Sequence, residues 1–383
     1  MKTVDKIIKV SNVGLRLTKF LLKTNVFKQT GEKRSYPKVV QLPLTYECDS
    51  KCVMCNIWNM DHSGEASAEE FSHFMKDPIF SKVEAIGING GEISLVKDFN
   101  SYVDEILKLP ELKHLNVISN GFRKDVLLSN CQKIYEKCKS KGISFHIALS
   151  LDGYEDVHNE VRGVRNAFTK VMSTLNEIKD NKNKYCDSYD VGCTVINQNV
   201  SYLMQLDEFC KSEDINIKYR MGIENERIES NLLTKNFSVL LNDKMQSAAE
   251  FFHMKYMETP LSSLPIKFKY FSIFYYLTKK DSKRLLGCYW KENGITLDSR
   301  GEIYYCAVKS KSLGSLRNSS GESVFFDEEN IAYRKGIIEN DCDNCIHDYH
   351  GVPEATNVLI FYKDMLKEFM AIRLYALKVR WLR

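Results

Sequence analysis

Three cysteines near the start of the chain have the spacing Cys48-x₃-Cys52-x₂-Cys55, directly after a strand-like run at 39–46. Cysteine makes up about 3% of the chain, so this triplet arises by chance in about 1% of comparable chains. Three thiolates can bind three irons of a [4Fe–4S] cluster and leave the fourth iron open to another ligand. The alternatives are a zinc site or three buried cysteines on one helix face, although Asp49-Ser50 favours a loop.

Four later strand-like runs also end in residues that can bind a ligand. Glycines let a backbone approach a ligand closely, a carboxylate can receive an ammonium group, and strand ends of βα folds carry ligand-binding loops. Taken singly, Gly-Gly-Glu also fits a simple turn, and a lone arginine fits a surface ion pair. The four ends read Asn89-Gly90-Gly91-Glu92, Ser119-Asn120-Gly121, Ser150-Leu151-Asp152-Gly153 (followed by His158, Arg162 and Gly163) and Thr194-Val195-Ile196-Asn197.

With the three cysteines, these segments make residues 39–220 resemble the radical S-adenosylmethionine (SAM) superfamily. The resemblance implies a [4Fe–4S] cluster on the first three cysteines and a SAM molecule bound to its open iron. In that family the Gly-Gly-Glu segment binds the amino group of SAM, a role that falls here to Gly90, Gly91 and Glu92.

Five further residues inherit cofactor contacts from the same resemblance. Ser150 and Arg162 are expected to hold the ribose and the carboxylate of SAM, and Asn120 lies in a segment similar to the family's Thr-Asn-Gly. Asn197 ends a strand that often contacts the cofactor, and a turn residue is an equally good interpretation. Met54 stands where the family commonly has an aromatic residue, and its polarisable side chain can still cover an adenine.

A second group of cysteines lies in the C-terminal part of the chain. The units Gly301-x₄-Cys306 and Cys342-x₂-Cys345, with Cys288 before them, resemble the SPASM/Twitch extension of the same superfamily. The resemblance implies one fully ligated auxiliary [4Fe–4S] cluster, and structural zinc is the alternative. A fully ligated cluster is suited to electron transfer and structure. The other five cysteines read as small apolar residues: Cys131, Cys138, Cys186, Cys193 and Cys210.

Six strand-like runs alternate with helical periods before residue 221. Parallel neighbours in a sheet need crossover connections, so this alternation predicts an α/β fold: a partial (β/α)₆ TIM-like barrel followed by a small C-terminal iron–sulfur domain. The predicted strands are 39–46, 83–88, 114–119, 144–150, 190–196 and 215–220, with helices near 67–76, 98–108, 124–140, 165–180 and 200–213.

Five segments follow from this reading. Residues 287–351 are separated from the barrel because they show short strand pieces and turns and too little helix to continue the βα pattern. The segments are a basic amphipathic stretch at 1–38, the core barrel at 39–235, a connecting helical segment at 236–286, a SPASM/Twitch-like auxiliary cluster domain at 287–351 and a basic C-terminal helix at 352–383.

The charge of the chain is concentrated at its ends. Residues 1–38 hold ten Lys/Arg and two Asp/Glu, and residues 356–383 hold six and two. The ends therefore carry +12, and since the whole chain carries +4, the remainder carries −8. An acidic body argues against a long nucleic-acid footprint. The basic ends either touch an anionic membrane or pack on the core as helices with solvated lysines.

The sequence also indicates a compartment. No apolar run approaches the roughly 20 residues that a membrane span needs. Lysines and an arginine interrupt the apolar positions of the first 23 residues, which argues against a signal peptide. We therefore expect a cytoplasmic protein, where clustered cysteines serve as metal ligands or catalytic groups rather than disulfides.

These patterns together predict a radical SAM enzyme of the oxidoreductase or maturase type. It would cleave SAM reductively to a 5′-deoxyadenosyl radical and take a hydrogen atom from a carbohydrate, another small molecule or a peptide, with the auxiliary cluster assisting oxidation or bond formation. Only 38 residues precede the first strand, which favours a small substrate or a peptide delivered by a separate protein. Tyr219 and Arg220 are candidate substrate contacts, and no general base is assigned.

The predicted partner for reduction is a flavodoxin or a ferredoxin. Two other function classes stay open. One is a radical SAM enzyme that modifies RNA, and the other is a non-enzymatic iron–sulfur or zinc protein.

Overall fold

The computed structural model describes residues 35–229, 236–241, 243–279, 283–291, 293–347, 351 and 353–381, with the backbone alone at 369 and 371–381. The predicted basic stretch at 1–38 therefore lies outside the described residues except for its last four. The described residues form two compact units. The larger contains residues up to 247 and 290–347, and the smaller contains 248–289 and the residues from 348 onward.

The larger unit is built on a single nine-stranded sheet, in the order β6-β5-β4-β3-β2-β1-β7-β8-β9. Its first six strands are parallel to their neighbours and follow chain order. This arrangement confirms the predicted partial barrel, with β6 and β9 as its edges. The six strands are β1 (Val39–Thr45), β2 (Ala85–Gly90), β3 (His114–Ser119), β4 (Ser144–Ser150), β5 (Ser188–Val195) and β6 (Ile217–Met221).

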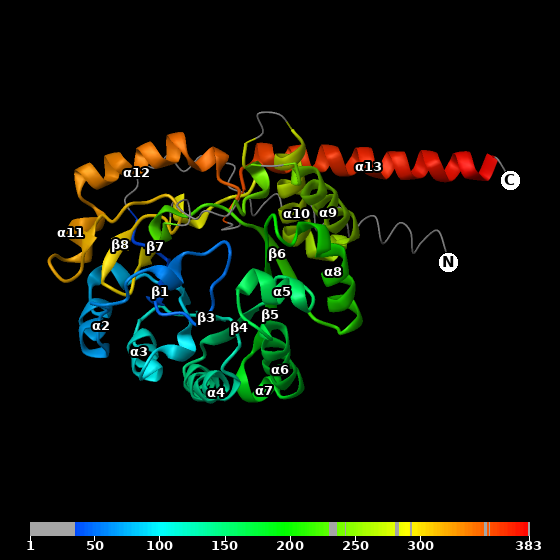
Figure 1. The fold of residues 1–383 in the computed structure, drawn as a ribbon. Helices are drawn as coiled ribbons and strands as arrows, with labels where there is room; N and C mark the ends of the chain where they lie inside the picture. The colour runs from blue at the N-terminus through cyan, green and yellow to red at the C-terminus, as the bar shows by residue number, and fades with distance from the viewer. Residues whose placement is uncertain are drawn as a thin grey trace. The chain divides into compact units, whose positions relative to one another are not determined.

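Helices connect these strands, and α2, α3, α4, α6 and α8 lie on the outer side of the sheet (Figure 1). In β3 and β4, buried residues alternate with less buried ones, so alternate side chains pack beneath the helices. The helix α2 begins at a capping box formed by Ser67 and Glu70. The helices are α2 (Ala68–Met75), α3 (Phe99–Ile106), α4 (Lys124–Ser140), α5 (Asp156–Arg162), α6 (Ala167–Asp180), α7 (Lys182–Tyr185) and α8 (Leu203–Ser212).

Residues 290–347 continue this sheet instead of forming a compact unit of their own. The strand β7 (Gly294–Leu297) pairs in parallel with β1, and β8 (Glu302–Tyr304) and β9 (Gly314–Ser315) follow in antiparallel order. The expectation of little helix in this segment is wrong, because α11 (Gly321–Phe325) and α12 (Glu328–Asn340) lie in it. A short 3₁₀ turn, η10 (Cys342–Asn344), follows.

The smaller unit is helical and aromatic. Its elements are the greater part of α9 (Met245–Glu258), α10 (Leu264–Thr278) and α13 (Ala355–Trp381). The centroid of the Phe361 ring on α13 lies 5.3 Å from the ring centroids of Phe268 and Phe271 on α10. This packing anchors the first turns of α13. Within the described ranges, no helix combines the length and the apolar character that crossing a bilayer requires.

Candidate functional site

The three predicted cluster cysteines lie on the loop after β1, which is not helical. This loop is held by the C-terminal end of α5: the backbone N–H of Lys51 donates to the carbonyl of Arg162 (2.9 Å), and that of Val53 to the carbonyl of Val161 (3.0 Å). Gly163 ends α5 with a φ of 63°, and a Cβ there would lie 2.5 Å from the carbonyl oxygen of Lys51. Only glycine allows the two segments to approach this closely.

The three cysteines line one cavity of about 200 Å³, together with residues at the carboxyl ends of β2 to β6. This is the end of a βα fold where ligands bind. Asn89, Trp58 and Thr194, which sequence reasoning did not assign, also line it. Seven of the eight predicted cofactor contacts are brought together there: Met54, Gly90, Gly91, Glu92, Asn120, Ser150 and Arg162.

Asn197 is the predicted contact that does not line this cavity. Its backbone N–H donates to the carbonyl of Phe237 (2.8 Å), and its side-chain amide contacts the carbonyl of Asn236 at 3.4 Å. The strand ends β5 and β6 instead present Thr194 and Arg220 to the cavity.

The two glycines at the end of β2, Gly90 and Gly91, are required by the neighbouring strand β1. The backbone N–H of Gly91 donates to the carbonyl of Thr45 (2.6 Å), and a Cβ on Gly91 would lie 1.9 Å from the carbonyl oxygen of Glu47. Gly90 has a φ of 117°, and its Cβ would lie 2.5 Å from the same carbonyl of Thr45. The segment therefore packs its backbone against the strand that leads into the cysteine loop.

Glu92 joins β2 to β3. Its carboxylate is 1% exposed and accepts hydrogen bonds from the Ser119 hydroxyl (2.7 Å) and from the backbone N–H groups of Asn120 (2.8 Å) and Ser94 (3.0 Å). Burial raises the pKa of Glu92, although these three donors favour its charged form. A carboxylate has about four acceptor positions, so one more donor, such as an ammonium group, can be accommodated.

Asn120 connects β3 to the cysteine loop. Its side-chain amide donates to Asp49 Oδ1 (2.7 Å) and to the Ser50 hydroxyl (3.1 Å), and its Oδ1 accepts from the backbone N–H of Phe122 (2.9 Å). Arg123 adds an ion pair with Asp49 at 3.1 Å. Both ends of the Asn120 side chain are therefore engaged in positioning the loop that carries the cysteines.

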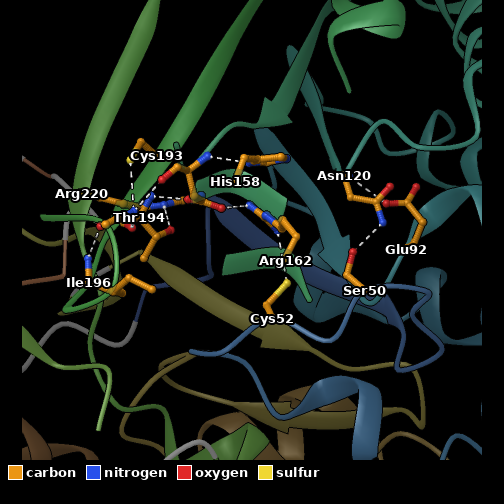
Figure 2. A network of polar contacts seen from close by, with 12 residues as sticks. Ser50, Cys52, Glu92, Asn120, His158, Arg162, Cys193, Thr194, Ile196 and Arg220 are labelled. Atoms are coloured by element: carbon orange, nitrogen blue, oxygen red, sulfur yellow. Dashed lines mark hydrogen bonds and ion pairs between the residues drawn. The ribbon is translucent and has the colours of Figure 1, made fainter. Parts of the chain in front are cut away.

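Arg162 forms the centre of a buried polar network (Figure 2). It forms an ion pair with Asp152, which is fully buried, and its Nη1 lies 3.5 Å from Cys52 Sγ. Burial works against the charged form, but the negative charge of Asp152 and the interaction with Cys52 outweigh it and raise the pKa of Arg162. The Nε of Arg162 is buried and has no partner among the residues that the structure describes.

A further set of residues fixes Asp152, and sequence reasoning gave none of them a role. Asp152 Oδ1 accepts from the backbone N–H of Thr194 (2.7 Å), and the Asn199 amide donates to the carbonyls of Asp152 (2.8 Å) and Thr194 (2.9 Å). The backbone N–H of Asp152 donates to Nδ1 of buried His158 (3.0 Å). Burial, followed by Arg162, lowers the pKa of His158, so the ring is a neutral acceptor. The signal in the sequence was the acidic residue within Ser-Leu-Asp-Gly.

The donor set fits a thiolate-bound iron–sulfur cluster with a polar organic ligand. All three cysteines are free, and burial raises the pKa of Cys48 and Cys55 to about 12 and also raises that of Cys52. Such thiols ionise when a bound cation supplies the compensating charge, as soft metal centres do. Trp58 Nε1 and Asn89 Oδ1 add buried polar atoms without protein partners at the same cavity. In the part of the chain that the structure describes, no three His, Cys, Asp or Glu side chains surround a single-ion position.

The second group of cysteines is distributed over both units. Cys306 follows β8, and its Sγ accepts from the backbone N–H of Val308 at 3.4 Å. Cys342 and Cys345 share the turn η10, closed by a hydrogen bond from Cys345 N–H to the Cys342 carbonyl (3.3 Å). Cys288 belongs to the smaller unit and is described apart from the other three.

Residues 42–210 match the sequence profile of the radical SAM superfamily, a range that contains the three cysteines and the strand ends β2 to β5. Residues 42–210 are a radical SAM domain. The radical SAM domain thus covers every cavity residue named above except Arg220.

Two curated proteins and one solved structure are similar to the chain. The sporulation killing factor maturation protein SkfB of Bacillus subtilis (strain 168) is 26% identical over 153 residues, 39% of this chain and 35% of SkfB. GTP 3′,8-cyclase of Vibrio atlanticus (strain LGP32) is 24% identical over 178 residues, 44% of this chain and 46% of the cyclase. The chain therefore matches less than half the length of either relative.

The structure of native anSMEcpe with bound AdoMet and the Kp18Cys peptide superposes with a TM-score of 0.58 at 17% identity. The superposition covers 89% of this chain and 99% of the anSMEcpe chain, so the two proteins share a fold.

Proposed function

We propose that this protein cleaves SAM reductively and takes a hydrogen atom from a bound substrate. The observation that carries the proposal is the convergence of Cys48, Cys52 and Cys55 with the Gly-Gly-Glu segment and Arg162 on one cavity inside the radical SAM domain. A structural metal site has no need for a cavity of this size beside its ligands. The convergence therefore favours an enzyme over a non-enzymatic metal protein.

The residues of this chain would bind and orient the cofactors. When bound, a [4Fe–4S] cluster and SAM supply the electron and the 5′-deoxyadenosyl radical for the hydrogen abstraction. The three cysteines hold the cluster, and Arg162, which is paired with Asp152, also contacts Cys52 Sγ. Glu92 receives the ammonium group of SAM at its remaining acceptor position. Met54 covers the adenine.

Ser150 and Arg162 complete the proposed SAM contacts at the cavity wall. The unpartnered Nε of Arg162 supports this role, because a ligand oxygen would satisfy it. Asn120 acts by positioning the cysteine loop.

For the second group we propose an auxiliary [4Fe–4S] cluster of the SPASM/Twitch type on Cys288, Cys306, Cys342 and Cys345. Its task would be to accept an electron after hydrogen abstraction, which gives oxidation or bond formation. A flavodoxin or ferredoxin would supply the electron for SAM cleavage. Zinc in place of this cluster would leave the same cysteines bound but remove the electron acceptor.

We propose a peptide as the substrate. Two relatives support this choice: SkfB is by name a maturation protein for a killing factor, and the anSMEcpe structure holds a peptide. Of the two substrate classes that the sequence favoured, a small molecule or a peptide delivered by a separate protein, this choice takes the peptide. A small molecule is the second candidate, because the cyclase relative is named for GTP.

The test of the main proposal is SAM cleavage by the anaerobically reconstituted protein. Under dithionite we expect 5′-deoxyadenosine and methionine in equal amounts, measured by liquid chromatography. Cys52→Ala should lose cluster iron and all product, and Cys48→Ala and Cys55→Ala should behave alike. The matched control is Cys131→Ala, a buried cysteine on α4 outside both groups, which should retain both. Product from any of the three cluster variants would refute the ligand assignment.

We also propose that α13 contacts an anionic membrane surface. Leu359, Leu366 and Met370 lie on one side of this helix and are 58%, 58% and 55% exposed. Lys363 and Lys367 lie beside them, and the sequence after Met370 holds four basic residues and no acidic one. An apolar stripe flanked by cations is the pattern of interfacial helices.

This contact predicts cosedimentation with vesicles of phosphatidylglycerol and none with vesicles of phosphatidylcholine alone. Leu366→Glu should abolish the binding, and 0.5 M salt should weaken it, as expected when about 1 kcal/mol per basic residue comes from surface charge. Equal partition to both vesicle types, or to neither, would refute it.

A further inference from the structure

Two arginines line the same cavity, and they differ in whether a described carboxylate balances their charge. Arg162 is neutralised by the buried carboxylate of Asp152. Within the part of the chain that the structure describes, Arg220 has one polar contact, a long one of 3.4 Å from its Nε to the Thr194 hydroxyl. Among the described residues, no carboxylate lies within ion-pair distance of Arg220. The cavity therefore contains a cation, Arg220, for which the described residues provide no counter-charge.

The sheet directs the guanidinium of Arg220 into the cavity. Successive side chains of a strand point to opposite faces. Tyr219 is fully buried and donates to Asp207 on α8 (2.9 Å), so it does not line the cavity and its predicted substrate contact is wrong. Arg220 takes the opposite face and lines the cavity beside Thr194, its partner in the β5–β6 register (Figure 2).

The neighbouring strand leaves room for this side chain. Gly192 lies two residues before Thr194 on β5, and a Cβ there would approach Arg220 Nη2 to 3.4 Å. A larger side chain at position 192 would displace the guanidinium. The space and the orientation are therefore both set by strands, which hold a group more precisely than loops do.

We propose that Arg220 is an anion subsite, which binds the carboxylate or phosphate of a molecule held in the cavity. A guanidinium offers two parallel N–H donors to such a group, and the pair is strengthened where water is excluded. The inference rests on the proposed function only in taking this cavity as the ligand site. The anion has two sources: the carboxylate of SAM, or an acidic group of the substrate such as a peptide carboxylate.

Protection of Arg220 from chemical modification tests the proposal on the reconstituted wild-type protein. Phenylglyoxal modifies accessible arginines, and peptide mass spectrometry reads each position separately. Arg165, which is exposed and outside the cavity lining, serves as the internal control. The probes are SAM, inorganic phosphate and acetate. We expect Arg220 to be modified without probe and protected by at least one of them, while modification of Arg165 stays unchanged.

The three probes distinguish the source of the anion. Protection by SAM assigns the subsite to the SAM carboxylate. Protection by phosphate or acetate that persists when SAM is already bound assigns it to the substrate. Arg220 that is unreactive without probe, or is modified equally with every probe, overturns the proposal.

Substitutions give a second measurement. For each probe that protects, Arg220→Gln should weaken binding roughly tenfold to a hundredfold, and Arg220→Lys should weaken it less because the charge remains. Arg165→Gln should change nothing. Equilibrium dialysis measures the binding, and circular dichroism checks the fold.

Failure of this inference is separable from failure of the proposed function. If the wild-type protein makes no 5′-deoxyadenosine, the proposed function is refuted, whatever the labelling of Arg220 shows. If Arg220→Gln and the wild type bind the protecting probe equally, the anion subsite is refuted, whatever the rate of SAM cleavage.

Discussion

The two groups of cysteines are held by different means. The first sits on a loop tied to three other places in the fold: α5 through two backbone hydrogen bonds, β3 through Asn120, and β2 through the packing of Gly91. In the second group, Cys342 and Cys345 share a single turn, and Cys306 lies in the short loop after β8. The first group is thus positioned by distant parts of the sequence, whereas two of the four cysteines of the second group share one short turn.

This difference agrees with the tasks proposed for the two groups. A cluster with an open iron needs a fixed geometry relative to the ligand that binds it, because small displacements of reacting groups are costly. A fully ligated cluster is itself a cross-link and can organise its own loops. Four experiments test whether the two groups differ in this way.

The largest effect is expected from Gly91→Ala. The added methyl group would lie 1.9 Å from the carbonyl oxygen of Glu47, so the start of the cysteine loop must move. We expect 5′-deoxyadenosine formation to fall roughly a hundredfold or more. Iron should be lost from the first group and kept in the second. Gly336→Ala, at a glycine with open space around it, is the control and should keep both. Unchanged turnover in Gly91→Ala would remove the distinction between the groups.

Cys345→Ala is the converse experiment. It should remove iron from the second group and abolish substrate conversion, because the proposed electron acceptor is lost. Cleavage of SAM should stay within a few-fold of wild type, since the first group does not depend on this turn. Iron analysis and 5′-deoxyadenosine formation are measured on the same sample. Equal loss of iron from both groups would show that they fold as one site.

Asp152→Asn should destabilise the protein by about 3–5 kcal/mol, because it leaves the buried charge of Arg162 without its partner. The comparison at the second group is Asp343→Asn, where the ion pair with Lys291 is 3.7 Å long and partly exposed. That change should cost about 1 kcal/mol or less. Urea unfolding followed by circular dichroism gives both values. Similar costs at the two sites would contradict the comparison.

The smallest effect concerns pH and His158. Its pKa in the folded protein is lowered below the ordinary value of 6.5, so below pH 6.5 the unfolded chain binds a proton that the folded one excludes. Stability is therefore fully present above pH 6.5 and is lost as pH falls, by about 1.4 kcal/mol per pH unit at most. His158→Gln should flatten this slope in urea unfolding between pH 7 and 5. An unchanged slope would exclude His158 as its source.

The strands and the first cysteine loop could be predicted from the sequence because their signals are local. Residues 114–119 and 144–150 were predicted at the bounds of β3 and β4, where buried positions alternate with less buried ones. Seven cofactor contacts were predicted through the resemblance to the radical SAM superfamily, whose motifs could be recognised in short stretches of this sequence.

What escaped prediction depends on pairing between distant segments. Nothing local to residues 294–297 indicates β1 as their partner, and nothing local to Tyr219 shows that it contacts α8 while Arg220 faces the cavity. The register of β6 decides that choice, because a shift of one residue would exchange the two side chains. The roles of Asp152 and Asn199 likewise arise only after β4 and β5 are side by side.

The pairing of β7 with β1 has a consequence for biosynthesis. Residues 39–41 begin the strand that leads into the first cysteine loop, and their neighbours on that side are residues 294–296. About 250 residues must leave the ribosome between the two halves of this ladder, and contacts so distant in the chain form late. Until then β1 presents an open edge, where a foreign strand can add. We therefore expect iron to be incorporated only after translation has passed residue 297, when β7 is already paired with β1.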